Sequence, residues 1–265
     1  MPREWQLEVP DVPLIAIAPH NGHYVRPQAA MLMAIDDETR LREEDPFTGE
    51  WAGGLPGTAI IGRRSRFEVD LNRPREKAIY IQPGDAWNLL VWHRRPPRPL
   101  ILRSRGHYDR FYRALRGLLE ATVARHGQCV VYDIHSYNHR RGGPTAPPDD
   151  PELNPQVIVG TRHIDRAYWT SVVDAFIGAL VTHDFRGGQL DVRENIKFGG
   201  GHLVRWIEAN FHRRACPIAI EFRKDFMDEW SGVPDREAVD AVGEALRATV
   251  DPALQALEAM GESHT

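Results

Sequence analysis

Acidic and histidine side chains follow directly on a short apolar run near the middle of this 265-residue sequence. The run that starts at Val130 is typical of a buried strand, and it carries Asp133, His135 and Ser136 towards its carboxyl end. Side chains two residues apart on a strand point to the same face, so Asp133 and His135 should lie side by side. Ligands of open α/β sheets bind outside the carboxyl ends of the strands. Taken alone, a buried histidine bonded to an aspartate explains the pair equally well.

Four other sets of polar residues stand at the ends of expected strands or in loops: His20 with His23, the acidic cluster Glu43 to Asp45, Asn72 with Arg73, and Glu221 with Arg223. Each set could be structural, but five sets in one α/β domain are better explained by one shared site. Two histidines and a carboxylate are the minimal protein ligands of a catalytic zinc, and a further glutamate could act as general base. Arginines at the rim suit a substrate carboxylate, because guanidinium binds it through two parallel hydrogen bonds.

Other kinds of chemistry lack their motifs in this sequence. No serine or cysteine stands in a nucleophile elbow, and no dinucleotide-binding glycine pattern opens a helix. The segment Phe198–His202 contains three glycines, but no Lys-Ser or Lys-Thr follows to complete a phosphate-binding loop. Glycine in such a loop lets the backbone approach a ligand closely. The residues therefore favour metal-assisted hydrolysis over covalent catalysis or redox chemistry.

Composition and charge are those of an ordinary globular protein, with 42% hydrophobic and 26% charged residues. A net charge of −4 gives no sign of nucleic-acid binding, and the arginines between 94 and 105 alternate with prolines, as in a solvated loop. No apolar run is long enough to cross a membrane and no secretory leader is visible, so we expect a cytoplasmic protein. Cys129 and Cys216 begin apolar runs and are expected to be reduced and buried.

The elements that must position these residues alternate between strand and helix. Strands are predicted at 13–18, 58–61, 67–71, 130–136, 156–160 and 216–220. Helices are predicted at 28–42, 108–125 and 167–182, and from about residue 234, where Pro252 should kink or divide the last one. Segment 75–106 is rich in proline and arginine and carries no clear pattern. The alternation indicates βαβ units of an α/β fold, and no linker divides the chain, so we expect one domain over residues 1–265.

Four motifs occur in an order that resembles the N-formylglutamate amidohydrolase family. They are Pro19-His20-Asn21-Gly22, the segment from Ser65 to Arg73, the segment from Asp133 to Ser136, and the segment from Ile220 to Glu229. Each motif is weak alone, whereas the ordered set spans roughly residues 13–230 and is fairly specific. The resemblance implies a zinc-carboxypeptidase-like and aspartoacylase-like fold, with three layers and a mixed, mostly parallel sheet flanked by helices. It also implies a zinc amidohydrolase acting on a small N-acyl amino acid or a short peptide with a carboxylate.

The resemblance also implies roles for single residues. His20 and His135 would be zinc ligands, and Glu221 would activate the attacking water. Asn72 and Arg73 would grip a substrate carboxylate, while Arg205 and Arg223 would belong to the pocket. The family usually carries Thr-Asp-Trp near residue 45, so the order of preference for the third ligand is Asp45, then Glu44, then His23.

One segment departs from the family pattern. Residues 137–141 read Tyr-Asn-His-Arg-Arg, where formylglutamate enzymes usually have Met-Pro. Because substrate specificity resides in loops, the acyl group and the amine stay open. Two alternatives also stay open. One is a zinc peptidase or cell-wall amidase of the same fold, and the other is a non-catalytic relative that binds zinc or a ligand. The presence of Glu221 argues against the non-catalytic relative, which needs no base at that position.

Overall fold

The computed structural model describes residues 11–262, and within them six strands form one sheet in the order β2-β1-β3-β6-β4-β5. The strands are β1 (Leu14–Ala18), β2 (Thr58–Ile61), β3 (Cys129–Tyr137), β4 (Val157–Gly160), β5 (Val192–Glu194) and β6 (Ala215–Arg223). Neighbouring strands run parallel, except that β4 runs antiparallel to β6. The expected mixed, mostly parallel sheet is therefore confirmed.

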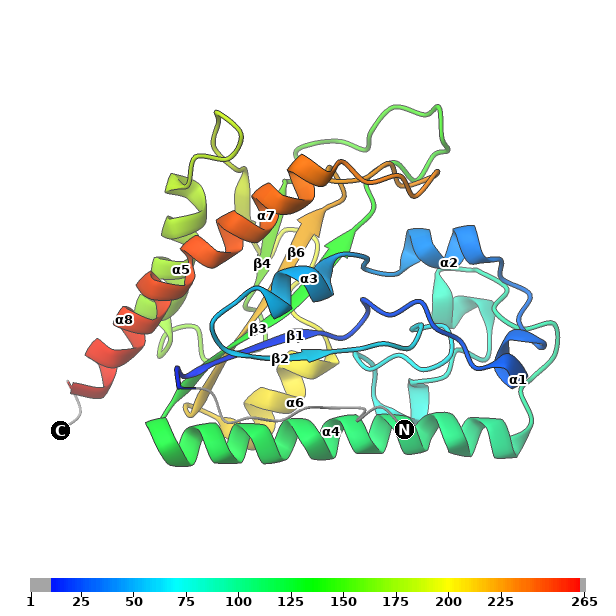
Figure 1. The fold of residues 1–265 in the computed structure, drawn as a ribbon, viewed down its shortest axis with the longest axis horizontal. Coiled ribbons are helices and arrows are strands. Elements are labelled where there is room, and N and C mark those ends of the chain that lie inside the picture. Colours follow the sequence, from blue (N-terminus) through cyan, green and yellow to red (C-terminus); the bar gives the residue numbers. More distant parts are fainter. Residues whose placement is uncertain (1–10, 263–265) are drawn as a thin grey trace.

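Helices cover both faces of the sheet (Figure 1). The helices are α1 (Pro27–Ala30), α2 (Asp37–Glu43), α3 (Thr48–Gly53), α4 (Arg98–His126), α5 (Thr170–Thr182), α6 (His202–Phe211), α7 (Arg236–Ala248) and α8 (Val250–Glu262). One apolar core joins α3, α5, α7 and α8 to the sheet, and a second joins α4 and α6 to the opposite face. These two cores and the sheet make the three layers that the resemblance implied.

The two long central strands, β3 and β6, form the middle of the sheet and carry polar residues at their carboxyl ends. They are paired over their whole length, with His135 opposite Glu221. A strand covered by helices on both faces reads as an almost continuous apolar run, which explains why both strands were found in the sequence. Asp133 is fully buried and His135 is nearly so. The free and buried state predicted for Cys129 and Cys216 is also found.

Three sequence predictions about elements are wrong. Residues 67–71 form turns and no strand, because Asp70 is held by side chains and its backbone bonds to Ala78 instead of to a neighbouring strand. The helix predicted at 28–42 is two short helices, α1 and α2, separated by residues 31–36. The arginine-rich stretch is not all loop, since α4 already begins at Arg98. Pro99 stands in its first turn, where a proline is tolerated because the missing N–H would have no partner within the helix.

The carboxyl-terminal helix is divided as predicted, although Thr249 marks the break. Helix α7 ends at Ala248, and Pro252 stands in the first turn of α8, where its missing N–H costs nothing. Among the helices of residues 11–262, none combines the length and the apolar character needed to cross a membrane.

Candidate metal centre

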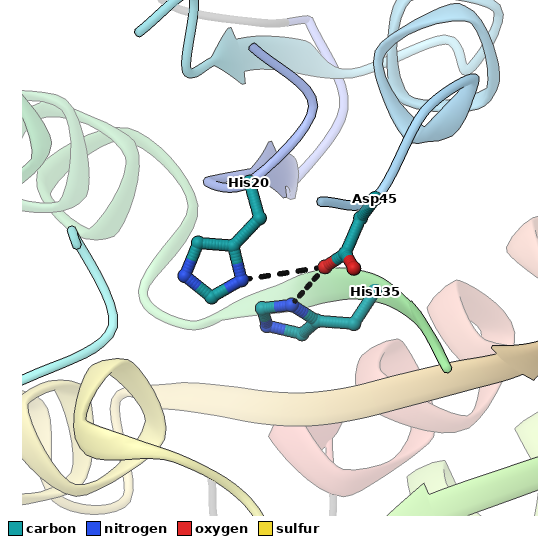
Figure 2. Close-up of side chains that lie close together, drawn as sticks. All are labelled: His20, Asp45 and His135. Atoms are coloured by element: carbon teal, nitrogen blue, oxygen red, sulfur yellow. Dashed lines mark hydrogen bonds and ion pairs between the residues drawn. The ribbon is translucent and has the colours of Figure 1, made fainter. Parts of the chain in front are cut away.

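Three side chains from different parts of the chain converge at the carboxyl ends of β1 and β3 (Figure 2). His20 follows β1, Asp45 follows α2, and His135 lies near the end of β3. Asp45 Oδ2 lies 3.3 Å from His20 Nδ1 and 2.9 Å from His135 Nδ1. One possible ligand atom from each residue lies within 4.8 Å of the other two. All three side chains are buried, so their polar atoms need partners or a cation.

Each histidine is held from behind by a second buried carboxylate. Asp70 Oδ1 lies 2.8 Å from His20 Nε2, and Asp133 Oδ1 lies 2.9 Å from His135 Nε2. Metal-binding histidines almost always give their other ring nitrogen to such a partner, which fixes the ring and its tautomer. Both Nδ1 atoms therefore face Asp45 in a fixed orientation. Two imidazole nitrogens and one carboxylate oxygen arranged in this way fit a zinc ion.

The turn that carries Asp45 is fixed by a buried lysine. Lys224 Nζ donates hydrogen bonds to the carbonyl oxygens of Arg42 and Glu44, at 2.5 and 2.7 Å. The backbone N–H of Asp45 donates to the carbonyl oxygen of His20 at 3.0 Å. Burial lowers the pKa of Lys224, against the attraction of the nearby Asp45 carboxylate. These contacts tie the loop after α2 to the ends of β1 and β6, and so hold Asp45 between the two histidines.

Charge coupling within the centre is strong. Burial alone would raise the pKa of Asp45, but the hydrogen bonds from His135 and His20 hold it below its usual range. Burial would likewise lower the pKa of His135, yet Asp133 and Asp45 hold it well above its usual value. The buried carboxylates around the centre therefore favour positive charge at the position of the two imidazole rings. A divalent cation in the same place would interact with the same carboxylates.

The two alternative ligands, Glu44 and His23, lie apart from this group and contact each other. His23 Nδ1 is 2.5 Å from Glu44 Oε2, and the His23 side chain is 43% exposed. The Arg40 guanidinium flanks the same pair. The geometry therefore favours Asp45, which was also the first choice from the sequence, as the third ligand.

Glu221 lies beside the centre on β6, directly opposite His135 in the sheet register. Burial raises the pKa of Glu221 to about 8, against the attraction of His135 for the carboxylate. Its side chain lines a cavity of about 390 Å³ together with His20, Asp45 and His135. A carboxyl group with a raised pKa can accept and return a proton near neutral pH, as a general acid–base requires.

Comparison with known proteins assigns the chain to a family. A family model described as N-formylglutamate amidohydrolase matches residues 12–227. The chain belongs to this family. This match confirms the resemblance that the four motifs indicated. Membership of the family indicates that the protein is an amidohydrolase.

Solved structures share the fold of this family member at low sequence identity. An N-formylglutamate amidohydrolase from Ralstonia eutropha JMP134 aligns with a TM-score of 0.72 and 18% identity, covering 95% of this chain and 97% of that one. A gene product of Agrobacterium tumefaciens aligns with a TM-score of 0.64 and 17% identity, covering 94% and 93%. A metallo-carboxypeptidase from Burkholderia cenocepacia reaches a TM-score of only 0.32 at 15% identity, covering 93% and 57%. No curated protein sequence matches the chain.

The cavity of this N-formylglutamate amidohydrolase family member is rich in cations. Its basic lining residues are Arg66, Arg73, Arg141, Arg162, Lys197 and Lys224. Its carboxylates besides Asp45 are Glu43 and Glu221. An excess of cations in an enclosed site attracts an anionic substrate. This charge therefore favours a substrate that carries at least one carboxylate.

The predicted substrate-binding residues separate into two groups. Asn72 and Arg73 line the cavity, but Asn72 is already engaged: its Oδ1 accepts from Leu203 N at 2.8 Å, and its Nδ2 lies 3.2 Å from His135 Nε2. Gly201 permits this arrangement, because a Cβ there would lie 2.4 Å from the Asn72 amide. The polar contacts of Arg73 are long, 3.9 Å to Asp70 and 3.4 Å to a backbone oxygen, and its guanidinium lies 5.7 Å from the centroid of the Tyr80 ring, so it can still take a ligand.

Arg205 and Arg223 do not line the cavity, and the prediction that they are pocket residues is not supported. Arg223 Nε bonds both carboxylate oxygens of Asp225 at 2.9 Å, and its Nη1 donates to the carbonyl oxygen of Asn154 at 2.6 Å. Arg205 lies on α6 with its Nη1 3.3 Å from His163 Nε2. Arg223 is therefore held by partners outside the cavity, whereas Arg205 contacts His163, a residue that lines the cavity. A strand or helix pattern in the sequence does not reveal these contacts.

Proposed function

We propose that the protein is a zinc-dependent amidohydrolase that cleaves the amide bond of an N-acylated, N-formylglutamate-like amino acid. The observation that supports it most directly is the convergence of His20, Asp45 and His135 beside Glu221 in a cation-rich cavity. Family membership supports the amidohydrolase reaction independently of this geometry.

The residues divide the work of amide hydrolysis among them. His20, Asp45 and His135 would hold the zinc, which when bound acts as a Lewis acid towards the amide carbonyl and water. Glu221 takes a proton from the attacking water and returns it to the nitrogen of the leaving amine, so that the products are a carboxylate and an amine. Asp70 and Asp133 keep the two imidazole rings oriented.

A metal and substrate assay tests this function. We expect about one zinc per chain, hydrolysis of formylated or acetylated acidic amino acids, loss of activity with a chelator, and recovery on adding zinc. Cleavage of peptides but not of these amino acids would favour the peptidase alternative. Zinc-loaded protein that binds N-acyl amino acids and cleaves none of them would favour the non-catalytic relative.

Arg73 should bind the carboxylate of the substrate. Replacing Arg73 by lysine keeps the charge but removes the planar pair of donors, so we expect kcat/KM to fall by about tenfold. An amidated substrate analogue should be poor for the wild type, and the preference for the carboxylate should be smaller in the variant. Steady-state kinetics with both compounds measures this effect.

Arg75→Lys is a matched control for this change. Arg75 stands two residues further on, and its guanidinium bonds Asp109 outside the cavity at 2.6 and 2.8 Å. We expect the control to retain the discrimination of the wild type. Equal discrimination by wild type and Arg73→Lys would show instead that Arg73 is structural.

A further inference from the structure

A second, smaller cavity of about 140 Å³ adjoins the metal cavity. Glu43, Trp87, Asn138 and Arg141 line both cavities, so the two share a wall. This wall includes Asn138 and Arg141 of the segment 137–141, in which the sequence departs from the family pattern. The departure in sequence therefore coincides with an additional space beside the metal centre.

The second cavity combines apolar surface with charged groups of both signs, from three arginines and from Glu43 and Glu229. Leu89 and the indole rings of Trp87 and Trp230 line it. The Arg42 guanidinium lies over the Trp230 ring, 4.1 Å from its centroid. Trp230 is fixed in turn, because its Nε1 donates to the carbonyl oxygen of Arg140 at 2.9 Å. Such a surface accepts an apolar or aromatic group.

Asn138, a residue of the shared wall, has a buried side-chain oxygen without a partner. The residue is 3% exposed, and within residues 11–262 its Oδ1 has no hydrogen-bond donor. Ser136 Oγ, also in the lining of the metal cavity, has no partner either. The backbone here is fixed, because the N–H of the next residue, His139, donates to Glu229 Oε1 at 2.6 Å. A buried polar atom left unpaired is costly, so its presence in the wall of a binding cavity points to a group of the ligand.

We propose that the metal cavity continues into a subsite at Asn138, which binds an additional amide N–H of the substrate and the apolar group next to it. The inference rests on the proposed amidohydrolase function and narrows its substrate class. The substrate is then an N-acylated dipeptide, or an amino acid acylated by another amino acid, and larger than a single formylated amino acid. The Asn138 side chain accepts the hydrogen bond, and Trp87, Leu89 and Trp230 contact the apolar group.

The Glu43–Arg141 ion pair stands at the junction of the two cavities. Its three N–O contacts are 3.3 to 3.4 Å long, and the Arg141 side chain is 44% exposed. Arg141 can turn from Glu43 towards an entering substrate, because its contacts are long and the buried Glu43 carboxylate keeps a 3.4 Å contact with Arg42 Nε. The released Arg141 then lies beside any carboxylate at the far end of an extended substrate.

The test compares substrates of different length on the zinc-loaded enzyme. The substrates are N-formylglutamate, formyl-leucyl-glutamate and formyl-glutamyl-leucine. For each dipeptide an analogue is also tested in which an ester replaces the amide between leucine and glutamate. In formyl-leucyl-glutamate, the extra residue lies on the acyl side of the Leu–Glu amide. In formyl-glutamyl-leucine, the extra residue lies on the amine side of the formyl amide. Product analysis identifies which amide is cleaved. We expect one dipeptide to exceed N-formylglutamate in kcat/KM. If that dipeptide is cleaved at its formyl amide, we expect its ester analogue to be about three- to tenfold poorer, since the ester lacks the N–H.

Asn138→Leu has nearly the same size and removes the acceptor. We expect it to lose most of the preference for the dipeptide over N-formylglutamate. Asn210→Leu is the control, because Asn210 lies on α6 outside both cavities and is bonded by Arg116, and its preference should match the wild type. A higher kcat/KM for N-formylglutamate than for both dipeptides would overturn the proposed subsite but not the proposed function. An unchanged preference in Asn138→Leu would do the same. Hydrolysis of none of the compounds would overturn the proposed function, and the subsite with it.

Discussion

Glu221→Gln is expected to lower kcat by about 10²- to 10⁴-fold, the usual contribution of a general base, while zinc stays bound and the fold stays intact. The amide keeps the shape of the side chain and cannot accept the proton from water. The reason for this expectation is the position of Glu221 near the end of β6, where it lies opposite His135 and lines the metal cavity. Zinc content, melting temperature and kcat are all measured on the one variant.

The competing explanation for Glu221 is a structural ion pair. Its partner would then be Arg223 or another basic group, but Arg223 bonds Asp225 and the backbone of Asn154 instead. A lower melting temperature with near-normal turnover per folded molecule would refute the catalytic role. Glu194→Gln is a suitable control, since Glu194 pairs with Arg166 outside the cavity and should change kcat little.

His135→Ala is expected to reduce the zinc content from about one per chain to near zero, and activity with it. The change removes one of the two imidazole ligands and leaves the buried Asp133 carboxylate without its partner. Elemental analysis of purified protein measures the metal, and circular dichroism checks that the variant is folded. Full zinc occupancy in His135→Ala would show that His135 is not a ligand and that other residues hold the zinc.

Asp45 and Glu44 offer a matched comparison for the third ligand. Asp45 Oδ2 faces both histidines, whereas the Glu44 carboxylate faces His23 and Arg40. We therefore expect Asp45→Ala to lose zinc and Glu44→Ala to keep it. The opposite result would reverse the assignment of these two neighbours.

The parts of the fold that the sequence predicted share a physical property, which is burial on both sides. Strands such as β3, β4 and β6 are mostly apolar because helices cover both faces, and the polar residues at the carboxyl ends of β3 and β6 mark the site. His20, His135 and Glu221 could be selected for this reason. Residues 67–71 have a similar apolar pattern, but their backbone turns around the buried Asp70 carboxylate.

The parts that sequence reasoning missed depend on contacts between distant segments. Arg66 was overlooked, although its Nη2 lies 2.9 Å from Asp70 Oδ2 and its side chain lines the cavity. The spacing of four residues between Arg66 and Asp70 was the available signal. Lys224 gave no signal, since its partners are backbone oxygens that lie 182 and 180 residues away along the chain. The elements β5 and α3 were missed because they have three and six residues, too few for a clear pattern, and α6 was missed as well.

The wide spacing of the three candidate ligands along the chain has a consequence for protein turnover. Asp45 is 25 residues from His20 and 90 residues from His135, so a zinc ion held by all three would act as a cross-link between distant segments. An unfolded chain does not present these ligands together, and the free energy of zinc binding would therefore add to the free energy of unfolding. Zinc supply would then govern how long the protein survives proteases in the cell, in addition to how fast it works.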